Sequence, residues 1–172
     1  MLFRSLQVGL SIGSDKNMAQ ILKTISPKLL LVPFATISGT LSFSAIATLF
    51  ISKWSIFEYL AVGSGFAYYS LSSILITELK SASSGMLLAT ELATIALIAN
   101  IIREIITLLG APLFVKIFGR LAPICAGGAT TIDTTLPVIT KYAGKDMVFI
   151  AIIHGIIVDL SVPFFVSFFC SL

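Results

Sequence analysis

Six ionisable side chains stand in predominantly apolar stretches of this sequence, where they could bind a cation or carry a proton. In chain order they are Glu91, Arg103, Glu104, Asp133, His154 and Asp159. Near the centre of a bilayer such a side chain costs at least about 2.5–3.5 kcal/mol, so its presence there indicates a function or a specific partner. The clearest example is the stretch ATIALIANIIREIITLL (93–109), where an arginine and a glutamate are adjacent.

Arg103 and Glu104 belong to a polar stripe on a predicted helix. Positions i, i+3, i+4 and i+7 of the stripe are Asn100, Arg103, Glu104 and Thr107, and this face must contact protein or water. Adjacent residues diverge by about 100° around a helix, so Arg103 and Glu104 are poorly placed to pair with each other. We expect Asp133 to be the partner of Arg103, which leaves Glu104 for a cationic ligand or a proton. The alternative is a buried ion-pair network that only fixes helix register.

The remaining ionisable groups have weaker signals. Glu91 lies near the start of its predicted helix, where an acid complements the helix dipole, and we interpret it as structural. His154, five residues before Asp159, could relay protons, although a lone histidine is more often a hydrogen-bonded packing residue. An intramembrane enzyme with His154 and Asp133 as acid and base would need a nucleophile or metal motif that the sequence lacks. The sequence therefore predicts no enzyme, no metal site and no cofactor.

Composition indicates that these groups sit in a polytopic membrane protein. Hydrophobic residues make up 57% of the 172 positions and charged residues 11%, with a mean hydropathy of +1.06, far from the roughly 45–50% apolar and about 25% charged residues of soluble domains. The basic residues form no clustered, aromatic-interleaved surface, which argues against nucleic-acid binding. Cys125 and Cys170 are far apart in sequence and suggest no disulfide framework.

Windows of about 20 residues with few charges predict an all-α fold with about five transmembrane helices. The windows are 29–51, 56–77, 84–109, 121–140 and 147–171. The third helix either continues through APLFVKIF as one long tilted helix or ends at Pro112. We expect a single membrane domain over 1–172, in which 1–28 is cytoplasmic or partly membrane-embedded and 29–171 is the helical core.

Charges between these spans predict the orientation of the chain. Seven basic residues fall on one side: Arg4, Lys16, Lys23, Lys28, Lys80, Lys141 and Lys145. Three fall on the other: Lys53, Lys116 and Arg120. The positive-inside rule then places the N-terminus in the cytoplasm and the C-terminus outside. Copies should insert the same way round, so we expect a parallel homodimer or a complex with a separate small membrane chain.

Two stretches are unsuited to a continuous helix, AVGSGFAYYSLSS (61–73) and APICAGGATTIDTTLP (122–137). The second has two bracketing prolines and a Gly-Gly step, which predict an interrupted helix with its non-helical part near Gly127–Thr131. Such backbone is tolerated in a membrane only where it is buried in protein or lines a wet cavity. For 61–73, a site and close packing of small residues both stay open. The residues predicted to bind substrate or couple protons are Glu104, Arg103, Asp133, Asn100, Gly127, Gly128, Thr130, Thr131, Thr134, His154, Asp159, Tyr69 and Ser70.

Four segments together resemble the lysine exporter LysO family, over roughly residues 57–165. They are FAYYSLSSILIT (66–77), ATIALIANIIREI (93–105), GGATTIDTTLPVI (127–139) and AIIHGIIVDLSVP (151–163). The resemblance implies an inner-membrane carrier that exports L-lysine and lysine analogues, coupled to proton entry. It also implies a distant similarity to cation/proton antiporters and bile-acid transporters, whose repeats contain a broken helix. Longer family members carry an additional N-terminal membrane portion, so this chain resembles a shortened form.

The expected function is export of L-lysine in exchange for protons. Opposing effects of burial and of a nearby arginine would leave Glu104 titratable at working pH, while the interrupted helix holds the backbone end of the substrate. Lysine, its analogues, ornithine and arginine stay open as substrates, because they present the same charges. The alternative is a non-transporting membrane subunit that completes a transporter with a separate chain.

Overall fold

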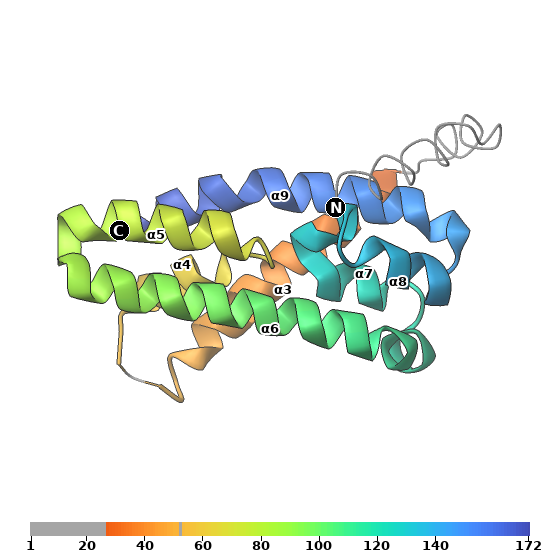
Figure 1. Ribbon diagram of the computed structural model, residues 1–172, viewed down its shortest axis with the longest axis horizontal. Helices are drawn as coiled ribbons and strands as arrows, with labels where there is room; N and C mark the ends of the chain where they lie inside the picture. The colour runs from red at the N-terminus through yellow and green to blue at the C-terminus, as the bar shows by residue number, and fades with distance from the viewer. Residues whose placement is uncertain (1–26, 52) are drawn as a thin grey trace.

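The computed structural model describes residues 27–51 and 53–172, and its regular elements in this part of the chain are all helical (Figure 1). In chain order they are η1 (Pro27–Leu30), α3 (Leu31–Ala47), α4 (Ile56–Gly63), α5 (Tyr69–Ser84), α6 (Met86–Phe118), α7 (Ala122–Gly127), η2 (Gly128–Ile132), α8 (Leu136–Tyr142), η3 (Lys145–Met147) and α9 (Val148–Cys170). The all-α prediction is confirmed for these residues. Nearly all of the predicted N-terminal segment 1–28 lies outside them.

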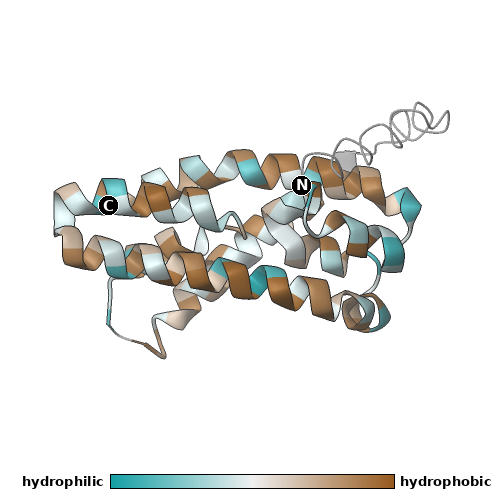
Figure 2. Cartoon of the chain, viewed as in Figure 1, coloured by the Kyte–Doolittle hydropathy of each residue, from teal (hydrophilic) through white to brown (hydrophobic). Residues whose placement is uncertain are grey.

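Two helical stretches are long and apolar enough to cross a membrane, the 33 residues of α6 and the 26 residues Lys145–Cys170. In their most apolar windows only 28% and 33% of residues are buried inside the protein, and Figure 2 shows hydrophobic residues along the length of both. An apolar surface of this extent fits lipid rather than water. Helix α6 runs through Pro112 to its end, so the longer of the two sequence alternatives is correct.

The predicted span 56–77 is a hairpin and not a single rod. A capping box starts α4, because the Ser55 hydroxyl accepts from the Glu58 N–H and the Glu58 carboxylate accepts from the Ser55 N–H. Glu58, near the start of α4, and Lys80, near the end of α5, both lie close to Cys170 at the end of α9. The chain therefore returns to the end at which it entered (Figure 1). A hydropathy window measures apolar length and not direction, which is why the prediction was wrong here.

The predicted span 121–140 is a second hairpin, formed by α7, η2 and α8. Arg120, just before α7, donates to the Ala143 carbonyl and forms an ion pair with Asp146, both of which follow α8. The interruption itself is confirmed: α7 ends at Gly127, a 3-10 turn follows, and α8 begins at Leu136. The break extends four residues beyond the predicted Gly127–Thr131.

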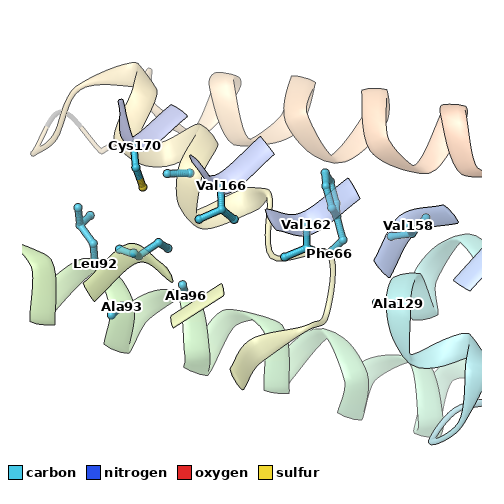
Figure 3. Packing of buried hydrophobic residues seen from close by; sticks show 11 residues of the cluster. Phe66, Leu92, Ala93, Ala96, Ala129, Val158, Val162, Val166 and Cys170 are labelled. Atoms are coloured by element: carbon cyan, nitrogen blue, oxygen red, sulfur yellow. The ribbon is translucent and has the colours of Figure 1, made fainter. Parts of the chain in front are cut away.

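The two hairpins enter from opposite ends and their tips meet in the middle of the molecule. The hairpin α4–α5 opens where α6 begins, and α7–α8 opens where α6 ends, about 50 Å away at 1.5 Å per residue. The Ala129 N–H donates to the Phe66 carbonyl at 2.9 Å. In Figure 3 Phe66 and Ala129 lie within the apolar cluster that α9 and α6 supply, beside Val158 and Val162.

Glu91 has an ion-pair partner that the sequence did not predict. It lies in the second turn of α6 and forms an ion pair with Lys53, from the loop before α4. A lysine, rather than the helix dipole alone, therefore neutralises this acid. The pair also places Lys53 at the same end of the molecule as Lys80, although the sequence analysis put the two on opposite sides.

Candidate functional site

The first hairpin tip, Ser64–Tyr68, has a strained backbone. Phe66 and Ala67 have φ angles of 43° and 77°, in the left-handed region that non-glycine residues rarely adopt. The buried Asn100 of α6 holds this turn, since its Oδ1 accepts from the Ala67 N–H at 2.7 Å and its Nδ2 donates to the Ala96 carbonyl at 2.8 Å. Asn100, predicted to bind substrate, supports the turn that forms one wall of the candidate site.

The second tip approaches the first so closely that only glycine fits at its start. Gly128 has a φ of 60°, and a Cβ at this position would lie 2.2 Å from the Phe66 carbonyl oxygen. A Cβ on Gly127 would lie 2.7 Å from Thr131 Cγ2. The Gly-Gly step that predicted the interruption is therefore explained by the contact between the tips.

Arg103 binds the backbone that the interruption sets free. Its Nε donates to the Ala126 carbonyl at 2.8 Å, its Nη2 to the Cys125 carbonyl at 3.0 Å, and its Nη1 to Thr40 Oγ1 at 3.3 Å. The carbonyls at the end of α7 have no partner in a following turn of α-helix, and a planar guanidinium satisfies two of them at once. The predicted pairing of Arg103 with Asp133 is therefore wrong.

Three carboxylates that are far apart in the sequence lie close together at the second tip. Asp133 is exposed and accepts hydrogen bonds from the N–H and hydroxyl of Thr134. Glu104 of α6 lies beside Asp133 and Thr134, and Asp159 of α9 also lies close to Asp133. The sequence predicted each acid separately, and the fold brings them together.

A cavity of about 380 Å³ opens between the two tips. Its lining residues are Ala67, Tyr68, Tyr69, Ser70, Ala129, Thr130, Ile132, Asp133, Thr134 and Asp159. Six of these were predicted from the sequence, and Tyr68 was missed although it precedes Tyr69 directly. A larger hollow of about 590 Å³ lies between α3 and α7, but no carboxylate lines it. The smaller cavity is therefore the candidate site for a cation.

His154 lies away from this cavity and links three elements. Its Nε2 is 2.9 Å from the Thr36 hydroxyl of α3 and its Nδ1 is 3.3 Å from the Thr131 hydroxyl of η2. The side chain is 1% exposed. These contacts favour the packing interpretation of His154 over the proton relay. Thr36 and Thr40, which hold His154 and Arg103 from α3, gave no signal in the sequence, because threonine is ordinary in an apolar helix.

The family model of the lysine exporter LysO matches residues 1–170. The chain belongs to the lysine exporter LysO family. It is 39% identical over 127 residues to the lysine exporter LysO of Escherichia coli (strain K12), a match that covers 71% of this chain and 38% of the relative. It is 35% identical over 126 residues to a putative lysine exporter of Haemophilus influenzae, over 73% of this chain and 60% of that relative. The chain thus spans less than two thirds of the length of these curated relatives. No solved structure matches it.

The segments by which the sequence resembles the LysO family are the ones that build this site. Residues 66–77 and 127–139 supply the two tips, 93–105 supplies the polar stripe of α6, and 151–163 supplies Asp159 to the cavity lining and carries His154.

Proposed function

We propose that this chain forms a membrane transporter that exports L-lysine through the cavity between the hairpin tips, in exchange for protons. The observation that carries the proposal is that Asp133 and Asp159 line one cavity in a predominantly apolar protein, with Glu104 close to Asp133. Relatives named as lysine exporters support the substrate. The lateral surroundings are lipid, since the long helices are apolar on the outside.

The charges of lysine fit this cavity. Lysine carries two ammonium groups and one carboxylate at neutral pH, so its site needs acids together with a few hydrogen-bond donors. Asp133 and Asp159 line the cavity and can accept from ammonium groups. Helix α5 begins at the cavity with Tyr69 and has no side-chain cap, so its first N–H groups and the Tyr69 and Ser70 hydroxyls can bind the substrate carboxylate.

The short distances between the carboxylates support an exchange of lysine for protons. Neighbouring carboxylates repel each other when both are ionised, so they bind either a proton or another cation. Glu104 lies at the edge of the group, beside Asp133. In the proposed cycle, lysine displaces a proton from this group on one side of the membrane, and a proton displaces lysine on the other.

Because the two hairpins return to the end at which they start, the number of basic residues at each end of the molecule differs from the sequence-based count. This number predicts the orientation of the chain in the membrane. Lys116, Arg120, Lys141 and Lys145 lie at the end where α6 finishes and α9 starts. Lys28 in η1 lies at the same end, because Val32 at the start of α3 packs against Val148. Of the basic residues in the described part of the chain, Lys53 and Lys80 lie at the other end. Among the described residues this gives five against two, and it supports a multi-pass inner-membrane protein in which the start of α3 lies on the cytoplasmic side.

This orientation predicts the side from which single cysteines react. In a variant without native cysteines, Lys145→Cys should react with a membrane-impermeant maleimide only in inside-out vesicles, and Ser84→Cys only in intact spheroplasts. Both positions are exposed at opposite ends of the molecule. Reaction of Lys145→Cys in intact spheroplasts would reverse the assignment.

Counterflow tests the function. Purified protein in proteoliposomes loaded with unlabelled lysine should accumulate labelled lysine, and loading with ornithine or arginine instead would define the substrate range. Counterflow that appears only when a second membrane chain co-purifies would assign the activity to a complex. Folded protein that shows no lysine counterflow in either form would refute the proposal.

A further inference from the structure

The two hairpins share one anchor on α6. Asn100 holds the turn of the first hairpin through the Ala67 N–H, and Arg103, three residues later, holds the end of α7 through two carbonyls. Residues three apart lie on the same face of a helix. One face of α6 therefore positions both tips, and the hydrogen bond from Ala129 to Phe66 closes them against each other.

The hairpins also repeat one arrangement in opposite orientations. In α4–α5–α6 and in α7–α8–α9, a short helix, a break and a returning helix are followed by a long helix. Glycines with positive φ, Gly85 at 88° and Gly144 at 109°, connect each hairpin to the long helix that follows or to the turn before it. Repeats of opposite orientation around one site are suited to alternating access, because each can open toward a different side.

We propose that α4–α5 and α7–α8 are the two gates of the lysine path, and that Asn100 is the positioning residue that keeps them closed. This inference rests on the proposed function. Phe66 and Ala67 are held in a conformation that persists only when surrounding contacts enforce it. Without the Asn100 carbonyl, the turn relaxes, the Phe66 carbonyl moves away from Ala129, and the cavity opens to the α4–α5 side.

A cross-link between the tips tests the gates. Ala67 and Ala129 line the same cavity, so Ala67→Cys and Ala129→Cys, combined in a variant without Cys125 and Cys170, should form a disulfide on oxidation. Counterflow of the oxidised double variant should fall about tenfold or more relative to the same protein after reduction. Each single variant, oxidised and reduced, is the control. Failure to cross-link, or equal counterflow in both states, would refute closure at the tips.

Substrate-dependent labelling tests Asn100 without requiring transport. Ile132 lines the cavity, is partly exposed and has no proposed role in binding, so lysine should slow the maleimide labelling of Ile132→Cys, in a variant without Cys125 and Cys170, when the gates close. Asn100→Ala should raise the labelling rate about tenfold and remove its dependence on lysine. Thr107→Val is the matched control, because Thr107 is also buried on α6 but donates only to its own helix, to the Arg103 carbonyl.

The outcomes separate this inference from the proposed function. A purely structural role for Asn100 would lower the melting temperature of Asn100→Ala and Thr107→Val alike and leave lysine-dependent labelling unchanged, which would refute the positioning role. If protein that keeps Asn100 shows neither counterflow nor lysine-dependent labelling of the cavity cysteine, the proposed function fails. If it shows counterflow while Asn100→Ala labels normally, the inference alone fails.

Discussion

Glu104→Gln is expected to remove most of the lysine counterflow while insertion and expression stay intact. Glutamine keeps the shape of the side chain and can still contact Thr134, but it can neither bind a proton nor carry the charge that a substrate ammonium requires. The loss of an interaction with a charged group corresponds to about 1.5–3 kcal/mol, so counterflow should fall by roughly 10- to 150-fold. The measurement is counterflow of labelled lysine in proteoliposomes at matched protein content.

Two further variants define the result for Glu104. Glu104→Asp should retain part of the activity with an altered pH dependence, because a carboxylate remains but lies further from Asp133. Glu78→Gln removes an exposed acid of α5 that does not line the cavity, and it should leave counterflow unchanged. Near-wild-type counterflow by folded Glu104→Gln protein would end the exchange mechanism.

The interruptions could be predicted because their causes are local. A Gly-Gly step bracketed by prolines marks backbone that an α-helix cannot keep, and Gly128 does adopt a positive φ. The direction of the chain after each break is not local. It depends on contacts such as Lys53 with Glu91, 38 residues apart, and on Arg120 with Asp146, 26 residues apart. Hydropathy therefore predicted two crossings where the chain returns.

The sequence predicted which types of residue lie at the candidate site, but it did not predict the hydrogen-bond partners of these residues. Charge complementarity suggested Asp133 for Arg103, but the guanidinium binds carbonyl oxygens of Cys125 and Ala126. Every residue has a carbonyl, so no sequence pattern reveals which ones a helix break leaves free. For the same reason the amide of Asn100 suggested a ligand, although it holds a backbone N–H.

Gly128→Ala should have the second large effect, on both stability and transport. A Cβ at this position would lie 2.2 Å from the Phe66 carbonyl oxygen, and the φ of 60° disfavours alanine even without that contact. Relief requires the tips to separate, which breaks the hydrogen bond from Ala129 to Phe66. Backbone strain and one lost buried hydrogen bond together predict a loss of about 2–4 kcal/mol in the free energy of unfolding. Thermal unfolding in detergent and counterflow would measure the two effects.

Substitutions at two other glycines distinguish the effect of backbone strain from the effect of the contact between the tips. Gly119 has a φ of 88° but open space around its Cβ position, so Gly119→Ala carries the backbone strain alone and should keep its counterflow. Gly39 lies within α3, also with open space, so Gly39→Ala should raise stability slightly, because alanine favours a helix. If Gly128→Ala loses no more stability than Gly119→Ala and still transports lysine, the tips do not need to touch. If only Gly128→Ala loses transport, the close approach of the two hairpins is required for function, because strain in the backbone is common to both variants.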